Sequence, residues 1–207
     1  PAYKPKTGEY LDVKNPVTMG AFATPAHYMD IRKELHDNLI SSEDLINQEY
    51  IKYNKTIKTK DVAMPAYKQA RPDAGYTTID NGVIEYTGPK NPKVIIIAMG
   101  SVVGTIKNAI RCQQKSSLLS KGLCQKIGVL KIKSFRPFPT DEINKIIGKT
   151  KYVAVMEKAI SLGHMGPLAS EIKAINKNKS AKIQSFIVGL GGRDITEKMI
   201  VKIVSQV

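Results

Sequence analysis

The chain has 207 residues, of which 42% are hydrophobic, and a formal net charge of +14 at pH 7. This apolar content supports one sizeable core and argues against a wholly disordered chain. The longest apolar run, residues 94–99, is far too short to cross a bilayer, and no signal peptide is visible. We therefore expect a cytoplasmic protein without a membrane partner, and the start at Pro1 without a methionine suggests a fragment or a processed chain.

The chain contains two cysteines, Cys112 and Cys124. They are too few for a disulfide framework, or for an iron–sulfur cluster that needs four thiolates, so free thiols in a reducing cytoplasm are expected. The positive charge raises nucleic acids, anionic cofactors and acidic proteins as partners. Because the lysines are scattered and no RNA-binding aromatic motif accompanies them, we favour a solvated lysine-rich surface, with an acidic partner as one option, over a nucleic-acid site.

Residues 1–80 are interpreted as an N-terminal arm or linker that continues from a preceding domain. Residues 1–24 are rich in proline and lack periodicity, which predicts an extended connector. Residues 55–80 are expected to be irregular. The arm has too little apolar surface to fold alone, so we expect it to pack on the following domain or on another chain.

One helix of the arm is predicted to begin at Pro25, because Thr24 is a suitable N-cap and proline suits the first helical position. Its apolar side chains recur at helical spacing over residues 28–39. A second helix is expected to start near Ser41, because Ser41 and Asp44 resemble a capping box.

Residues 81–207 alternate between apolar runs and amphipathic helical patterns. This alternation predicts an α/β domain with a mainly parallel sheet and helices on both faces. Strands are expected over residues 83–86, 94–99, 127–133, 152–156 and 183–188. Helices are expected over residues 102–120, after a Thr140 cap, from Pro167, and after a capping box formed by Asp194 and Glu197.

The loops that follow the parallel strands are the place to look for a site, because ligands bind beyond the carboxyl ends of such strands. The loops are residues 100–101, 134–139, 157–166 and 189–194. We expect their polar and glycine-rich residues to converge on one edge of the sheet.

The first candidate is the turn at Gly100 and Ser101, with Gly104 in the helix that follows. Backbone N–H groups at a helix N-terminus bind anions. In the alternative, which we favour, Ser101 caps the helix and Gly100 allows the strand to turn.

Three side chains on the same loops are further candidates. Arg136, on a proline-rich loop, would hold a carboxylate across an interface or pair within the domain. Glu157 ends a buried strand, where a carboxylate acts as a general acid or, more commonly, pairs with a basic group. His164 lies on a glycine-containing loop and would shuttle a proton, although the sequence shows no partner to orient it.

The last candidate is the glycine-rich segment with Gly191, Gly192, Arg193 and Asp194. It approaches the dinucleotide-binding fingerprint, but Asp194 stands where a third glycine or alanine is required and would repel a pyrophosphate. We therefore favour an interface loop. No nucleophile elbow, P-loop or metal-ligand cluster is present, so the residues indicate no complete catalytic machinery.

Several of these segments, taken together, resemble the α chain of pyruvate:ferredoxin oxidoreductases. They are residues 15–20, 28–29, 97–101, 104–105, 129–133, 136–139 and 189–196. The order and spacing agree from about residue 10 to the end. The resemblance implies the end of a first domain followed by a second domain similar to the transketolase C-terminal domain.

The resemblance also implies an activity for the whole enzyme. That family oxidatively decarboxylates pyruvate on thiamine diphosphate, transfers the acetyl group to coenzyme A, and passes electrons through iron–sulfur clusters to ferredoxin. The pyrimidine-binding domain would precede residue 1, and the parts that bind diphosphate, Mg²⁺ and clusters would belong to other regions or subunits.

We therefore expect this chain to bind no cofactor alone, to contribute no catalytic residue, and to act as a scaffold and interface that is inactive in isolation. Its basic surface would favour encounter with anionic coenzyme A, thiamine diphosphate and ferredoxin. Two alternatives stay open. One is the C-terminal domain of a transketolase-like or 2-oxoacid dehydrogenase enzyme, and the other is a basic module that binds anions or nucleic acid.

Overall fold

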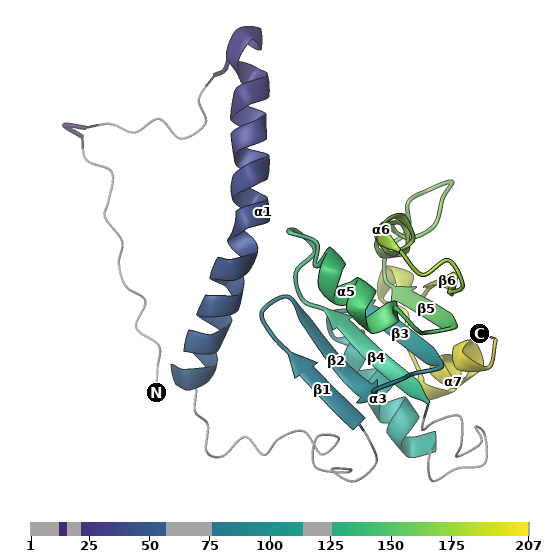
Figure 1. Cartoon of the computed structure of the whole chain (residues 1–207). Coiled ribbons are helices and arrows are strands. Elements are labelled where there is room, and N and C mark those ends of the chain that lie inside the picture. The colour runs from purple at the N-terminus through teal and green to yellow at the C-terminus, as the bar shows by residue number, and fades with distance from the viewer. Residues whose placement is uncertain (1–12, 16–21, 57–75, 114–125, 207) are drawn as a thin grey trace. The chain divides into compact units, whose positions relative to one another are not determined.

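The computed structural model describes residues 13–15, 22–56, 76–113 and 126–206 (Figure 1). The chain divides into two compact units, Pro1–Asn38 and Leu39–Val207. This division falls earlier than the expected boundary at residue 80, because the second half of the long helix α1 (Pro25–Thr56) contacts the sheet domain.

A sheet of six strands, in the order β1-β2-β4-β3-β5-β6, forms the centre of the second unit. The strands are β1 (Tyr76–Asp80), β2 (Ile84–Pro89), β3 (Val94–Met99), β4 (Ile127–Ile132), β5 (Tyr152–Glu157) and β6 (Lys182–Ile187). Strands β4, β3, β5 and β6 run parallel, and β1 and β2 extend the sheet as antiparallel strands. The expected mainly parallel α/β sheet is confirmed, and β1 is an addition within a segment that was expected to be irregular.

Helices cover both faces of this sheet (Figure 1). They are α3 (Val102–Gln113), α5 (Thr140–Ile147), α6 (Pro167–Ile175) and α7 (Glu197–Ser205). The expected extension of α3 to residue 120 lies outside the described residues. Side chains of α3 and α7 pack on one face, and those of α5 and α6 pack on the other.

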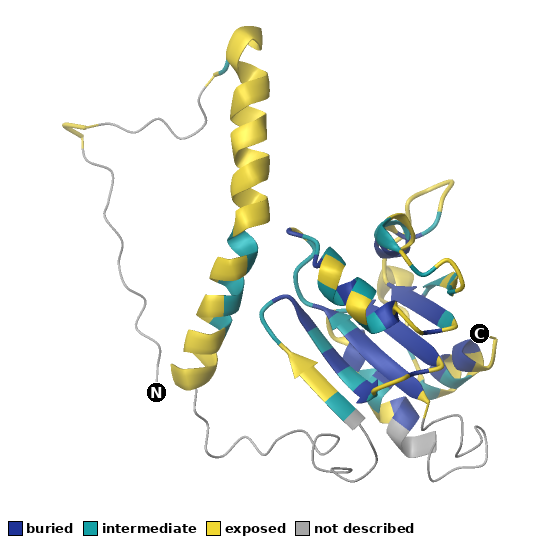
Figure 2. Cartoon of the chain, viewed as in Figure 1, coloured by how far each residue is buried: buried dark blue, intermediate teal, exposed yellow. Residues whose placement is uncertain are grey.

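Strand β3 explains why the core is continuous through the sheet. Its apolar side chains alternate between the two faces, so that Ile96 joins one cluster while Ile95 and Ile97 join the other. Each of these isoleucines has 0% of its surface exposed, and Figure 2 shows the central strands as the buried part of the unit. This burial on both faces is typical of parallel strands in α/β domains.

Two of the expected helix starts are wrong in detail. Helix α7 begins at Glu197, and the hydroxyl of Thr196 accepts a hydrogen bond from the Met199 N–H at 3.3 Å. Thr196 is therefore the N-cap, and the expected capping box of Asp194 and Glu197 does not form. Thr140 is the first residue of α5 rather than its cap, and its hydroxyl donates to the Phe138 carbonyl oxygen instead.

Helix α1 is continuous, whereas two helices were expected. The hydroxyl of Ser42 donates to the Leu39 carbonyl oxygen at 2.6 Å, a bond within the helix rather than a cap for a new one. None of the residues of α1, all of which the structure describes, is buried. The expected apolar face is therefore exposed, with Tyr28 at 57% and Leu35 at 55%. Across the described part of the chain, every helix is too short or too polar to cross a membrane.

The second half of α1 is held against the turn between β1 and β2. The Gly82 N–H donates to Asn47 Oδ1 at 2.9 Å, and the Tyr50 hydroxyl donates to Asp80 Oδ1 at 2.9 Å. Lys133 forms an ion pair with Asp80 and lies 3.8 Å from the centre of the Tyr50 ring. Burial of the ammonium group lowers the pKa of Lys133, but hydrogen bonds to Asp80 and Tyr50 outweigh this, so the pKa lies above the ordinary lysine value.

A pair of carboxyl groups marks a second contact of the same half of α1. Burial raises the pKa of Glu43, and the adjacent Glu142 carboxyl, in the first turn of α5, raises it further. This contact therefore favours a protonated Glu43, and it is weakest where both carboxyl groups are charged.

Candidate functional site

The parallel strands bring the expected loops to one edge of the sheet, as the sequence predicted. Strands β4, β3, β5 and β6 are adjacent and point the same way, so the segments that follow them leave from a common edge. We call this the carboxyl edge. It carries residues 133–139, 100–101, 158–166 and 188–196.

A pocket of about 500 Å³ lies at this edge, at the ends of β3 and β5. It is lined by Met99, Gly100, Ser101, Val102, Phe135, Glu157, Lys158, Ala159, Pro167 and Leu168. Of the predicted candidates, the pocket brings together Gly100, Ser101 and Glu157. Gly104, Arg136, His164 and the glycine-rich segment are not among its lining residues.

Glu157 is buried at the end of β5, with 7% of its surface exposed. Its Oε2 accepts a hydrogen bond from the Leu168 N–H at 2.8 Å, and its Oε1 accepts one from the Ala169 N–H at 3.0 Å. The carboxylate thus meets the first turn of α6, where backbone donors lack helical partners and the helix dipole favours a negative charge. The expected basic partner of Glu157 is replaced by these backbone amides.

Gly166, which precedes α6, is required by this arrangement. A Cβ atom at this position would overlap the carboxyl group of Glu157. The glycine therefore allows the chain to pass beside the carboxylate just before Pro167 begins the helix. Together, Glu157 and Gly166 fasten the two ends of the loop that connects β5 to α6.

The turn between β3 and α3 forms the opposite wall of the pocket. Gly100 adopts a left-handed conformation, with φ of 71°, and Ser101 directly precedes α3. The carbonyl oxygen of Ser101 accepts a hydrogen bond from the Gly104 N–H at 3.0 Å. Gly104 is exposed, with open space beside its Cα atom.

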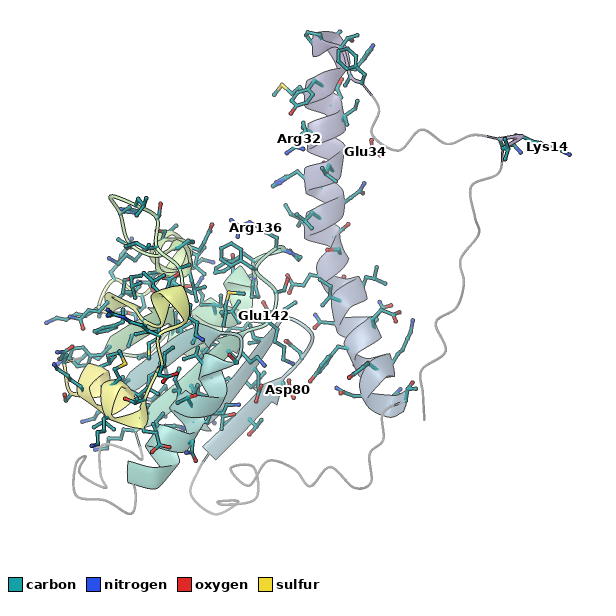
Figure 3. All side chains as sticks on the ribbon, turned by 180° about the vertical axis from the view of Figure 1, so that it is seen from behind. Lys14, Arg32, Glu34, Asp80, Arg136 and Glu142 are labelled. Atoms are coloured by element: carbon teal, nitrogen blue, oxygen red, sulfur yellow. The ribbon has the colours of Figure 1, made fainter. Side chains whose placement is uncertain are left out.

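Arg136, which is labelled in Figure 3, pairs within the domain, and this is one of the two arrangements expected for it. Its Nη2 lies 2.5 Å from Glu171 Oε1 on α6. Its guanidinium group also lies 4.5 Å from the centre of the Phe135 ring, and Phe135 in turn lines the pocket. Arg136 therefore links the loop after β4 to the helix that Glu157 caps.

The remaining candidates lie on exposed loops. His164 is exposed, and its backbone N–H donates to the Ser161 carbonyl oxygen at 2.8 Å. Gly191 and Gly192 adopt left-handed conformations, with φ of 64° and 81°. The following residues 193–196 are not helical, so these glycines do not open α7 as the glycines of a dinucleotide fingerprint open their helix. Arg193 and Asp194 are exposed.

Sequence reasoning missed two parts of this edge. Phe135, in the loop of residues 134–139, was not singled out as a candidate, although it lines the pocket. The bond between Glu157 and α6 was also missed, because it joins residues 11 and 12 positions apart. A buried strand ending in glutamate, followed by a Gly-Pro pair that starts a helix, is a signal that points to it.

These features define a class of protein: an α/β domain whose loops gather at the carboxyl edge of a mostly parallel sheet. Among the described residues, no group of three or more His, Cys, Asp or Glu side chains is placed to hold a metal ion. The model of the family "Pyruvate:ferredoxin oxidoreductase core domain II" matches residues 92–200, and the chain belongs to this family.

Two curated relatives illustrate the similarity. The chain is 33% identical over 206 residues to pyruvate synthase subunit PorA of Methanocaldococcus jannaschii, which covers 99% of this chain and 46% of the relative. It is 31% identical over 187 residues to ketoisovalerate oxidoreductase subunit VorA of Pyrococcus abyssi, covering 89% of this chain and 41% of the relative. The chain thus spans less than half the length of these relatives.

A solved structure is also similar. It is a 2-oxoglutarate:ferredoxin oxidoreductase from Magnetococcus marinus, with a TM-score of 0.47 and 18% sequence identity, covering 88% of this chain and 23% of that chain.

Proposed function

We propose that this chain is a non-catalytic scaffold and interface part of a thiamine-diphosphate-dependent 2-oxoacid:ferredoxin oxidoreductase, with pyruvate as the 2-oxoacid. The observation that carries the proposal is the family match over residues 92–200. The similarity to a pyruvate synthase subunit over 99% of the chain supports pyruvate, and the similar identity to a ketoisovalerate enzyme makes the substrate a point to test. The match favours this proposal over a transketolase-like enzyme or a free anion-binding module.

We propose that the cofactors of such an enzyme are held outside this chain. Two cysteines in the whole sequence do not supply the four thiolates of a typical iron–sulfur cluster. In the part of the chain that the structure describes, no group of three or more His, Cys, Asp or Glu side chains is placed to hold a metal ion, and the buried carboxylate of Glu157 is occupied by backbone amides. Thiamine diphosphate, Mg²⁺ and the clusters would therefore be held by other regions or subunits, which together with ferredoxin and coenzyme A are the proposed partners.

The proposed interface is the carboxyl edge. Large apolar side chains are exposed on two of its loops: Ile160 at 43%, Leu162 at 90% and Leu190 at 41%. Exposed apolar side chains that gather on one edge are typical of a contact surface. The loop candidates, including Gly100, Ser101, Gly104, Arg136, His164 and residues 191–194, would form the polar part of this contact. Glu157 would act by positioning α6.

Copurification tests the proposed function. The natural gene product that contains this chain would be tagged and isolated with its partners. Reduction of ferredoxin would then be measured with coenzyme A and each of pyruvate, 2-ketoisovalerate and 2-oxoglutarate. We expect thiamine-dependent activity with the highest kcat/KM for pyruvate. A preference for another acid would correct only the substrate, whereas isolation without such activity would contradict the assignment.

A single position tests the proposed interface. Leu162→Asp places a charge on the most exposed of these apolar side chains and should lower the yield of copurified partners by about tenfold. Leu162→Met, which keeps an apolar side chain of similar size, should leave the yield unchanged. Equal yields from the two variants would exclude this loop from the interface.

A further inference from the structure

The edge of the sheet opposite the pocket carries a row of lysines. Strands β2, β4, β3, β5 and β6 are neighbours in this order, and each has a lysine where it meets this edge. The residues, in the order of the strands, are Lys90, Lys126, Lys93, Lys151 and Lys182, which we call the amino-edge lysine row. All five are exposed.

Backbone hydrogen bonds establish that the row is continuous across the parallel strands. The Lys93 N–H donates to the Lys126 carbonyl oxygen at 2.8 Å, and the Lys182 N–H donates to the Lys151 carbonyl oxygen at 2.9 Å. Between these pairs, the Tyr152 N–H donates to the Lys93 carbonyl oxygen at 3.2 Å. Because neighbouring strands lie about 4.8 Å apart, five strands spread the row over about 19 Å.

The acidic residues of the α/β part lie elsewhere. Between residues 76 and 206 there are eight: Asp80, Glu85, Asp141, Glu142, Glu157, Glu171, Asp194 and Glu197. Seven lie at the carboxyl edge, on loops, at strand ends or in first helical turns. Asp80 and Glu85 are among them, because β1 ends and β2 begins beside the end of β4. The eighth, Glu171, is paired with Arg136. The described carboxylates therefore leave the amino-edge lysine row without an acidic counterpart.

The row has a partial explanation within the fold. Helices α5, α6 and α7 run against the parallel strands, so their C-terminal ends lie at the amino edge, where the dipole favours cations. That effect falls off within the last helical turn, and the five lysines lie in strands or directly beside strand ends rather than in helices. Neighbouring ammonium groups on adjacent strands repel one another and gain little from the helices.

We propose that the amino-edge lysine row is a docking surface for an acidic segment of another polypeptide. A row of positive charges about 19 Å long is matched by carboxylates on an extended or helical segment of similar length. The attraction would steer the partner before contact and would weaken as salt is added.

The side chains at the row fit an acidic polypeptide better than a nucleic acid. All the cations are lysines, so the row lacks the planar guanidinium groups that read phosphates and guanine edges in pairs of hydrogen bonds. The described aromatic ring beside the row is that of Tyr152, which is only partly exposed. The Lys151 and Lys182 ammonium groups lie 5.3 and 5.9 Å from its centre, so they cover the ring that a base would stack on.

The test uses the full chain and a fluorescent glutamate oligomer as the probe. The row variant carries Lys93→Gln and Lys126→Gln. The matched control carries Lys55→Gln and Lys198→Gln, which remove the same charge from exposed positions outside the row. We expect the row variant to bind the oligomer about tenfold more weakly and the control less than about threefold more weakly. Equal losses would overturn the proposal, because the binding would then depend on net charge alone.

Two further measurements complete the test. A variant with Lys93→Arg and Lys126→Arg keeps the charge and should bind as the unchanged chain does, which separates a charge effect from a folding defect. A single-stranded oligonucleotide of equal charge should bind more weakly than the glutamate oligomer. The acidic-polypeptide assignment would be overturned if the unchanged chain bound the oligonucleotide more tightly than the glutamate oligomer and the row variant lost that binding. None of these measurements depends on the enzyme activity proposed above.

Discussion

The two edges of the sheet are built from the same strands but differ in whether their charged side chains have partners within the chain. At the carboxyl edge, three charged side chains have partners within the chain: Glu157 with α6, Arg136 with Glu171, and Lys133 with Asp80. At the amino edge, the five lysines of the row are exposed and no described carboxylate faces them. The carboxyl edge therefore uses its charges to hold loops in place, whereas the amino edge presents them outward.

The difference follows from strand direction. Parallel strands send all their outgoing loops to one edge, so capping groups, turns and the pocket accumulate there. Substitutions at the carboxyl edge should therefore change stability, and substitutions in the lysine row should change binding but not stability. The predictions below test the first half of this contrast, from the largest effect to the smallest.

Gly166→Ala should have the largest effect. The added methyl group would overlap the Glu157 carboxyl group, and we expect a loss of about 3 kcal/mol in the free energy of unfolding, measured with urea. Gly104→Ala is the matched control. It adds a methyl group to open space on α3 and should be neutral or stabilise by up to about 1 kcal/mol. A mild effect at Gly166 would contradict the close packing of the loop on the carboxylate.

Glu157→Gln should cost about 2 kcal/mol, because one of the two buried N–H groups of α6 would face an amide NH₂ instead of an oxygen. Hydrogen exchange of the Leu168 and Ala169 amides should become faster in the variant. Unchanged exchange would show that these amides do not depend on the carboxylate. Glu171→Gln, which alters a partly exposed pair, should cost less than about 1 kcal/mol.

Lys133→Met should cost about 1 kcal/mol, since it removes the ion pair with Asp80 and the hydrogen bond to the Asn81 carbonyl oxygen. Because the pKa of Lys133 is raised in the folded state, its contribution is full below the ordinary lysine pKa and is lost as the pH rises through the raised value. The difference between variant and unchanged chain should therefore shrink in alkaline urea titrations. Lys173→Met, at an exposed position, should change the free energy of unfolding by less than about 0.5 kcal/mol.

Glu43→Gln should have the smallest effect and the opposite sign. The raised pKa of Glu43 means that its favourable contribution is full below the ordinary glutamate pKa and is lost as the pH rises through the raised value. At neutral pH the variant removes repulsion from Glu142 and should stabilise by about 0.3 kcal/mol. The gain should vanish in acid. A gain that persisted in acid would contradict the carboxyl pair as its cause.

The sequence predicted the central strands well, because β-branched apolar runs such as residues 94–99 are buried on both faces and need no partner to be recognised. Pro25 and Pro167 also marked their helix starts correctly, since proline suits only the first turn. Strand β1 was missed because its five residues include two threonines and an aspartate, and it is defined by pairing with β2. The cap of α7 was misplaced because the choice between Asp194 and Thr196 depends on how the chain approaches the helix.

The candidate site was predictable in place but not in its contacts. The parallel direction of the strands follows from the alternation of elements, so the convergence of the loops could be inferred. The partner of Glu157 could not, because it is a set of backbone amides that tertiary packing delivers. The lysine row was hidden for a similar reason, since its members are scattered along the chain from residue 90 to residue 182 and meet only across the sheet.

The fastening of the β5–α6 loop by Glu157 has a consequence for changes within the loop itself. Because the carboxylate joins the end of β5 to the start of α6, the residues between them form a loop whose two ends are fixed. A change in the length of this loop need not move the strand or the helix. Each doubling of such a loop costs only about 0.6 kcal/mol in closure entropy. Insertions, deletions or substitutions within residues 158–165 should therefore leave the sheet beneath them unchanged.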